Sequence, residues 1–217
     1  MSIPRTRRGR PKDLDKRDAI LEAAKTLFLE QGYAGTSMDR IAAAAGVSKL
    51  TLYSHYSHKE DLFQQCVVAK CQEHVPDAIY DPANRAPLRQ RLLTIGTAFV
   101  ELVMSDEAIK FYRMMAAEAR QTGRLGKLFY AAGPQRTLDQ FEQLLAAAER
   151  SGELELRDRC RAANHFFSLL QGDHHMRAMM GERRAPAREL RAHVADVVAV
   201  FLKAYAPGAL KTTCHRL

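Results

Sequence analysis

The sequence predicts an all-α protein, in which an N-terminal three-helix domain with a helix-turn-helix precedes a C-terminal helical bundle. Apolar residues recur every three to four positions through most of the 217-residue chain, and no segment shows the alternation of a strand. The stretch from Ser37 to Tyr56 reads as two short helices joined by a tight turn. Apolar residues make up 47% of the chain, which is ample for a packed core.

The first 14 residues are expected to form a flexible basic arm, because they combine arginines with proline and glycine and lack an apolar period. The run Arg8-Gly9-Arg10-Pro11 resembles the core of an AT-hook, in which both arginines would enter a narrow, A·T-rich minor groove. The formal charge of +8 agrees with an anionic partner. A solvated basic tail is the alternative interpretation of this segment.

A first helix is expected from Asp15 to Gln31, and Gly32 would end it. This helix would brace the two short helices that follow. Its apolar stripe consists of Ile20, Leu21, Ala24, Leu27 and Phe28.

Two short helices are expected on either side of Gly46, which can adopt the positive φ that a tight turn needs. Thr36 is a suitable N-cap for the first of them, with Asp39 in its positive first turn. Ser48 can cap the second. The second helix would then present its N-terminal turn to solvent.

The second short helix carries side chains suited to the major groove of DNA. Lys49 can donate to guanine, Thr51 can hydrogen-bond to bases, and Leu52 can pack on thymine methyl groups. The aromatic residues after them suit phosphate oxygens, which fix the register on the duplex. The expected DNA-binding residues outside the arm are Thr36, Ser37, Ser48, Lys49, Thr51, Leu52, Tyr53, His55, Tyr56 and Lys59. A buried helical hairpin with an aromatic core is the alternative.

A fourth helix is expected from Ser57 to about residue 75, because Ser57 and Glu60 form an S-x-x-E capping box. Lys59 lies at its start, where its ammonium and the free N–H groups could both meet a phosphate.

The segment AAAAGVSKLTLYSHYSHKEDLF resembles the DNA-binding signature of TetR-family transcriptional regulators. His58 departs mildly, since the family more often has a small residue there. The resemblance implies a three-helix DNA reader at about residues 15 to 56 and a phosphate contact by Lys59. The matching residues are Ile41, Ala45, Gly46, Val47, Ser48, Lys49, Thr51, Leu52, Tyr53, Tyr56, Lys59 and Glu60.

Beyond residue 76 the pattern stays helical. Segments FYRMMAAEARQTGRLGKLFYAAGPQRTL and QGDHHMRAMMG resemble the C-terminal domain of the AefR-like branch of the same family. Helices are expected at about 87–104, 106–121, 125–132, 134–151, 157–180 and 186–205. The expected domains are a basic arm (1–14), a DNA-binding domain with a linking helix (15–75), an effector and dimerisation domain (76–206) and a flexible tail (207–217).

The resemblance implies that the C-terminal domain dimerises and encloses a small effector. Thioethers and aromatic rings suit a hydrophobic or aromatic ligand, although Arg113 or His165 could recognise an anion. Ordinary core packing is the alternative for each apolar residue. The expected pocket residues are Phe99, Phe111, Met114, Met115, Phe129, Tyr130, Phe141 and His165.

The last two long helices carry apolar stripes that the family would use for dimerisation. The expected interface residues are Phe166, Leu170, His174, Val194, Val198 and Phe201. Adjacent helical residues point about 100° apart, so His174 and His175 cannot readily share one metal ion. No metal site and no cofactor is therefore expected.

No apolar run approaches the roughly 20 residues that span a bilayer, and the N-terminus lacks the apolar region of a signal peptide. We therefore expect a cytoplasmic location, in contact with the nucleoid through DNA and without a membrane partner. Cys66, Cys71, Cys160 and Cys214 fit no C-x-x-C spacing, so reduced packing cysteines are expected.

These patterns predict a homodimeric, sequence-specific regulator that binds a pseudo-palindromic DNA operator. It would act as a repressor, with helix 57–75 as the lever through which an effector releases the operator. No enzymatic activity is expected, since the sequence lacks a nucleophile elbow, H-E-x-x-H and a phosphate loop. Two alternatives remain: a metal-dependent enzyme using the His-rich segment 165–175, and a sequence-tolerant architectural DNA binder.

Overall fold

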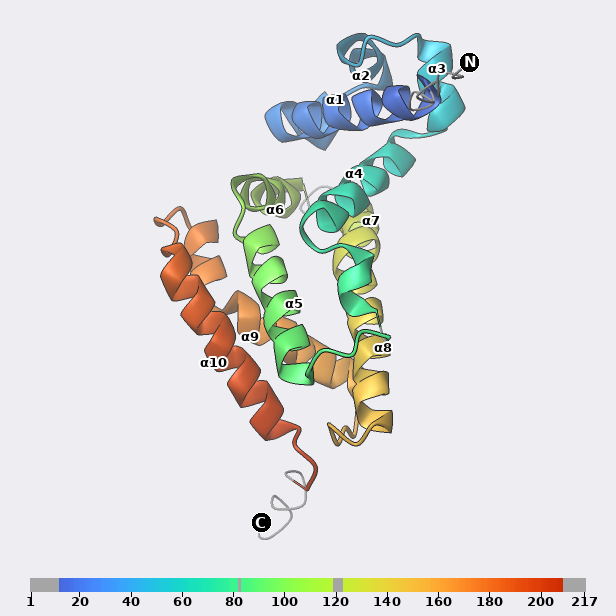
Figure 1. Ribbon diagram of the computed structural model, residues 1–217. Coiled ribbons are helices and arrows are strands. Elements are labelled where there is room, and N and C mark those ends of the chain that lie inside the picture. The colour runs from blue at the N-terminus through green and yellow to red at the C-terminus, as the bar shows by residue number, and fades with distance from the viewer. Residues whose placement is uncertain (1–11, 82, 119–122, 209–217) are drawn as a thin grey trace, which may run out of the picture. The chain divides into compact units, whose positions relative to one another are not determined.

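The computed structural model describes residues 12–81, 83–118 and 123–208, and every regular element within these ranges is helical (Figure 1). The all-α prediction is therefore confirmed. The elements are α1 (Lys12–Gly35), α2 (Met38–Ala44), α3 (Lys49–His55), α4 (Lys59–His74), η1 (Asp77–Tyr80), α5 (Leu88–Val103), α6 (Asp106–Glu118), α7 (Gly123–Tyr130), η2 (Ala131–Gln135), α8 (Arg136–Arg150), α9 (Arg159–Met179) and α10 (Ala187–Ala204).

The chain divides into two compact units between Val67 and Val68, inside α4. The first half of α4 therefore belongs to the first unit and its last turns belong to the second. The sequence placed the functional boundary after residue 75, and that boundary stays a prediction.

The first unit packs α1, α2, α3 and the start of α4 around an aromatic centre. Phe28 of α1 meets Phe63 of α4 edge to face, with ring centroids 5.6 Å apart. Gly32 interrupts α1 with φ 73°, as the sequence predicted, and Tyr33 beyond it stacks on Phe28 with centroids 5.6 Å apart. The interruption thus returns the chain onto its own core before α2 begins.

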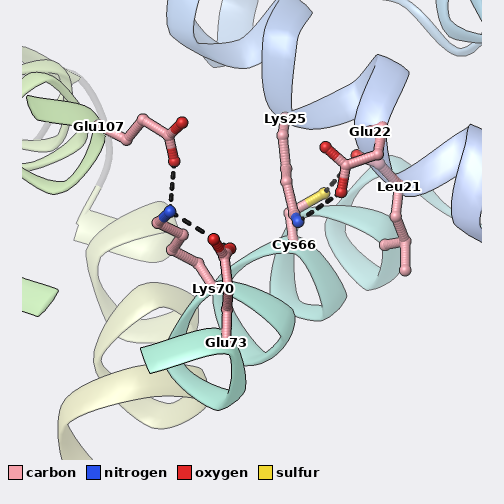
Figure 2. A network of polar contacts seen from close by, with 7 residues as sticks. All are labelled: Leu21, Glu22, Lys25, Cys66, Lys70, Glu73 and Glu107. Carbon is pink, nitrogen blue, oxygen red and sulfur yellow. Dashed lines mark hydrogen bonds and ion pairs between the residues drawn. The ribbon is translucent and has the colours of Figure 1, made fainter. Parts of the chain in front are cut away.

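A buried cysteine adds a polar link between α4 and α1. The Cys66 thiol donates to the Leu21 carbonyl at 3.8 Å (Figure 2). Burial raises the pKa of Cys66 to about 12, and burial likewise raises the pKa of Cys71 to about 11. Both thiols therefore stay protonated at neutral pH, which suits packing groups. Cys160 is exposed, and Cys214 lies outside the described residues.

The second unit has its core among α5, α8, α9 and α10. Phe141 of α8 stacks on Phe166 of α9 with centroids 4.7 Å apart, and Phe166 meets Phe201 of α10 edge to face at 5.1 Å. Helix α5 approaches α10 closely at Gly96, where an added Cβ would lie 2.9 Å from a Val194 methyl group. Three aromatic rings and one glycine thus fix how these helices pack.

Local features depart from the expected helices of the second unit. A 3₁₀ turn, η1, lies in the predicted connection before α5, and a π-type turn containing Pro134 precedes α8. The expected continuous helix 157–180 is interrupted at Gly172, with φ 47° and ψ −154°. These are corrections to the sequence prediction, because helical periodicity does not report a single non-helical residue.

The break at Gly172 is held by a histidine from α10. His193 Nε2 lies 3.1 Å from both the Leu169 and the Leu170 carbonyl oxygens. Because a carbonyl only accepts, Nε2 carries the proton. An added Cβ at Gly172 would lie 3.3 Å from the His193 ring, in a backbone conformation that only glycine adopts readily.

None of the described helices combines the length and the apolar content that crossing a bilayer requires.

Candidate nucleic-acid interface

The N-cap of α2 is Ser37, whose Oγ accepts a hydrogen bond from the Arg40 N–H at 3.3 Å. The predicted cap, Thr36, is 2% exposed, and its hydroxyl lies 2.8 Å from the Gly32 carbonyl oxygen and 3.1 Å from that of Leu27. The prediction of Thr36 as cap and DNA-facing group is wrong. Thr36 and Ser37 both carry a hydroxyl group that could cap α2. Thr36 is buried in the core, and Ser37 caps the helix.

The turn between α2 and α3 depends on Gly46, which has φ 66°. The Val47 N–H donates to the Ala42 carbonyl at 3.0 Å and so closes the turn over the end of α2. An added Cβ at Gly46 would meet no atom within 4 Å, so the requirement there is one of backbone conformation alone.

Helix α3 begins with the cap that the sequence predicted. Ser48 Oγ accepts from the Thr51 N–H at 3.1 Å and lies 2.9 Å from the Thr51 hydroxyl. Lys49 Nζ lies 2.6 Å from Asp39 Oδ2, and both side chains are exposed. The first turn of α3 is therefore capped, and its lysine is already paired with a carboxylate of α2.

Burial divides the expected contact residues of α3 into two faces. Leu52 is 0% exposed and Tyr56 is 5% exposed, whereas Leu50 is 82% exposed and Tyr53 is 48% exposed. The prediction that Leu52 packs on thymine is wrong, because Leu52 holds α3 against the core. Leu50, which the sequence reasoning missed, is the apolar side chain that the exposed face presents.

The spacing of these residues in the sequence indicates which side of α3 is buried. Leu52 and Tyr56 are four apart and share one face of a helix, whereas Leu50, two residues before Leu52, lies on the opposite side. Tyr56 is also held from α1, since Arg17 Nε donates to its hydroxyl at 3.3 Å. The prediction of Tyr56 as a phosphate contact is corrected to a packing role, while His55 is half-buried.

Lys59 forms an internal link in the first unit. Its ammonium donates to the Tyr33 carbonyl at 2.8 Å and the Thr36 carbonyl at 2.9 Å, and lies 4.1 Å from the Tyr33 ring centroid. These contacts tie the start of α4 to the segment between α1 and α2. Lys59 therefore has a structural role, and its phosphate contact stays a prediction.

The capping box of α4 lies one residue later than predicted. The Asp61 carboxylate accepts from the His58 N–H at 3.1 Å, so His58 takes the position expected for Ser57 and Asp61 that of Glu60. Arg8 and Arg10 lie outside the described residues, so their groove contacts stay a prediction.

Most expected effector residues of the second unit are explained by packing. Phe99, Met115 and Phe141 belong to the buried core, and Tyr130 is half exposed. His165 is exposed and lies 2.7 Å from the Tyr205 hydroxyl. These are corrections to the predicted pocket. Phe111, Met114 and Phe129 are partly buried on α6 and α7 and stay candidates.

Arg113, which the sequence offered as an alternative anion-binding residue, bonds to the end of α9. Its guanidinium caps the end of α9, donating from Nε to the Met179 carbonyl at 3.0 Å and from Nη2 to the Ala178 carbonyl at 2.7 Å. An open hollow of about 410 Å³ lies along α5 and contains none of the expected residues. Its lining is Leu93, Thr94, Thr97, Ala98 and Glu101.

The predicted dimer residues are mostly interior. The buried ones are Phe166, Leu170, Val194, Val198 and Phe201. They are corrected to core residues, because the inner faces of α9 and α10 pack within the chain. The large apolar side chains exposed on this part are Leu169, Met176, Met180 and Val200.

His174 is half-buried, with its ring centroid 5.1 Å from that of His193 and its Nδ1 3.8 Å from Glu189 Oε1. In the described ranges, no three His, Cys, Asp or Glu side chains are grouped so that they could hold a metal ion.

Two family models match the chain. Residues 20–66 match the bacterial regulatory proteins of the tetR family, and residues 90–207 match the AefR-like transcriptional repressor C-terminal domain. The first match contains the capped α2–turn–α3 unit described above, and the second spans the α5–α10 bundle.

Relatives of known structure agree. The flavonoid-responsive regulator FrrA is 34% identical, with a TM-score of 0.72 over 89% of this chain and 98% of FrrA. A TetR-family regulator from Mesorhizobium loti is 27% identical, with a TM-score of 0.75 over 91% of this chain and 100% of its own.

Curated relatives include a regulator and an activator. YdeS, an HTH-type transcriptional regulator of Bacillus subtilis, is 30% identical over 134 residues, which cover 57% of this chain and 68% of YdeS. FasR, an HTH-type transcriptional activator of Mycolicibacterium smegmatis, is 38% identical over 106 residues, or 46% of each chain. The family models and these relatives together show that the chain belongs to the TetR family of DNA-binding transcriptional regulators, with an AefR-like C-terminal domain.

Proposed function

We propose that this regulator is a homodimeric repressor that binds a pseudo-palindromic operator and leaves it when a small aromatic or hydrophobic effector binds. The observation that carries the DNA side of the proposal is the exposed face of α3. There Lys49, Leu50 and Tyr53 project from a helix that Ser48 caps and Leu52 anchors. Lysine and an apolar side chain at a helix start are suited to base edges in the major groove.

The dimer rests on the outer faces of the last two helices. Leu169 and Met176 on α9 and Val200 on α10 are exposed although apolar, as is Met180 at the end of α9. Apolar side chains gathered on one part of a surface favour association. A two-fold dimer would present two α3 helices to successive major grooves about one helical turn apart, and so match an inverted repeat.

The class of effector is supported by a relative. FrrA is described as flavonoid-responsive, and the structural match covers 98% of its chain. In this chain, α6 and α7 bring together Phe111 and Phe129, with centroids 5.6 Å apart, and Tyr112, whose ring meets Phe129 at 5.4 Å. These partly buried rings suit an aromatic ligand.

Coupling to DNA is supported by the contacts of α6 within the second unit. Figure 2 shows Lys70, in the last turns of α4, between Glu73 and Glu107, with Nζ 2.5 Å from the Glu107 carboxylate in the first turn of α6. Arg184 pairs with Asp106 at 2.7 Å. A shift of α6 would therefore act on α4, and a coupling of about 1–3 kcal/mol changes operator affinity about 5- to 150-fold.

Neither the metal-dependent enzyme nor the architectural DNA binder gains support from the relatives. The test is selection of bound duplexes from a random DNA pool by the full-length protein, followed by sequencing. An enriched inverted repeat is expected, and the Lys49→Ala variant should lose the enrichment at particular base pairs. If the protein retains all DNA sequences of the pool equally, sequence-specific binding is contradicted.

A further inference from the structure

The second unit contains buried polar side chains for which the described part of the chain supplies no hydrogen-bond partner. Tyr80 is 4% exposed, and its hydroxyl has no such partner. The same is true of His74 Nε2 and His175 Nε2, which are also buried atoms. Arg91 Nε is a fourth such atom in this unit. Buried polar atoms are paired in the great majority of native proteins, so these unpaired ones need an explanation.

Two further side chains connect these atoms. Tyr112 of α6 meets the His175 ring of α9 edge to face, with centroids 5.2 Å apart. Cys71 lies one turn before His74 on α4, and its sulfur is close enough to both tyrosines to act on their ionisation. We call these five residues the polar cluster: Cys71, His74, Tyr80, Tyr112 and His175.

Aromatic rings continue the cluster on one side. Phe129 of α7 meets the Tyr112 ring with centroids 5.4 Å apart, and Phe111 of α6 lies next to Phe129. The Tyr112 hydroxyl group of α6 and the His175 imidazole of α9 thus belong to a set of rings that continues into α7. That combination suits an aromatic molecule with polar substituents.

Four members of the cluster, Cys71, Tyr80, Tyr112 and His175, are uncharged at physiological pH. Burial raises the pKa of Tyr80 and raises that of Tyr112 to about 12, with Cys71 adding to both, while burial lowers the pKa of His175. The nearby guanidinium of Arg136 is already paired with Asp77 at 2.6 Å. A bound carboxylate or phosphate would therefore find no counter-charge among these four groups, and burial makes an unpaired charge costly.

We infer that the polar cluster binds the effector, and that the effector is an uncharged aromatic molecule carrying at least two hydroxyl or carbonyl groups. Each phenol can donate one hydrogen bond and accept others, and each imidazole nitrogen can do either according to its tautomer. The inference rests on the proposed function, since it assigns the polar part of the effector site.

The ligand test compares two flavanones with the same skeleton, using the full-length protein and isothermal titration calorimetry. Naringenin carries three hydroxyl groups, and unsubstituted flavanone carries none. We expect naringenin to bind at least about tenfold more tightly, because it pairs groups that flavanone leaves unpaired. Equal affinity for the two flavanones, or tighter binding of the anionic apolar ligand decanoate, would overturn the inference.

The protein test removes one hydroxyl at a time. Tyr80→Phe and Tyr112→Phe should each weaken naringenin binding about tenfold and leave flavanone binding unchanged. Tyr130→Phe is the matched control, because Tyr130 is half exposed and lies outside the cluster. The melting temperature of the ligand-free Tyr80→Phe protein should stay equal or rise, since the change deletes an unpaired buried hydroxyl. A clear fall in that temperature, or unchanged naringenin affinity in both variants, would contradict the inference.

A separate measurement keeps the two proposals distinguishable. Operator binding is followed by fluorescence anisotropy without ligand, on the inverted repeat recovered by selection. Specific operator binding together with no binding of naringenin would overturn the effector assignment and leave the regulator intact. Naringenin binding with no preferred DNA sequence would contradict the proposed function and support the ligand site.

Discussion

The two units of the chain treat their internal polar groups differently. In the first unit, the Thr36 hydroxyl and the Lys59 ammonium are bonded to carbonyls of their own chain, and Gln31 Oε1 is a buried atom without a partner among the described residues. In the second unit, the Tyr80 hydroxyl and the His175 Nε2 are buried without a partner among the described residues. The first unit thus bonds within itself two polar groups that the sequence assigned to DNA. The second retains bonding capacity for a molecule that the chain itself does not supply.

The largest expected effect tests the packing of the second unit. Phe141→Ala removes a ring with 0% exposure that stacks on Phe166, and should destabilise that unit by about 3–5 kcal/mol. Chemical denaturation followed by circular dichroism measures this loss. Phe141→Leu, which keeps most of the volume, should cost clearly less, and equal costs would show that the site does not depend on the ring.

Lys59→Met tests whether the first unit is held internally. Loss of the two hydrogen bonds to the Tyr33 and Thr36 carbonyls should cost about 2–3 kcal/mol in unfolding free energy. Operator affinity should fall without a change in its salt dependence. A salt slope reduced by about one would restore the phosphate role that the sequence suggested. Lys25→Met is the control, because Lys25 pairs with Glu22 on the same helix.

Gly46→Ala tests the turn of the reader. Because Gly46 has φ 66° and open space around it, alanine should cost about 1–2 kcal/mol through backbone strain alone. The matched control is Gly126→Ala in α7, where nothing lies within 4 Å of the added Cβ. There the same substitution should stabilise by about 0.5–1 kcal/mol. Thermal denaturation should therefore show shifts of opposite sign, and shifts of the same sign would contradict the conformational explanation.

Asp39→Asn tests the exposed ion pair at the start of α3. An exposed pair contributes under about 1 kcal/mol, so stability should hardly change. Operator affinity should rise by up to about fivefold, because Lys49 no longer has to break its ion pair with Asp39 before it contacts DNA. Glu22→Gln removes one negative charge elsewhere in the first unit and is the control in the anisotropy titration. An equal gain in operator affinity for both variants would show that the gain comes from the change in net charge and not from the loss of this ion pair.

The smallest expected effect concerns pH. Hydrogen bonds from Gln140 and Arg136 lower the pKa of Asp77. A carboxylate with a lowered pKa stabilises the folded state above its unfolded pKa, and this contribution disappears as the pH falls through the folded value. Asp77→Asn should therefore make the stability of the second unit less dependent on acid pH, as unfolding titrations can measure. An unchanged pH profile would show that the contacts of Asp77 do not contribute.

Much of the fold could be predicted because its signals are local. Apolar spacing and capping residues placed α5, α8 and α10 within a few residues of their bounds, and a glycine between two capped segments identified the turn at Gly46. The Gly172 break could not be predicted, because the residues on both sides keep a helical pattern and the conformation is secured by a distant histidine.

The candidate site was less predictable, because one helical face differs from another only through what packs against it. Leu50 and Leu52 have the same side chain two residues apart, and only the tertiary structure shows which one is exposed. Several expected pocket residues and most expected dimer residues lie in the core, since apolar residues at helical spacing suit a core, a ligand and a partner equally. The polar cluster was missed because its members come from separate helices.

The interruption at Gly172 divides the surface of α9 into two parts. Gly172 resets the rotation of the helix, so residues before and after it do not fall on one helical wheel. The first segment can bury Phe166 and Leu170, while the second independently turns Met176 outward. Inserting a residue before Gly172 would rotate only the first segment, whereas an insertion after it would rotate only the second. One stretch of chain thus contains two separately adjustable surfaces.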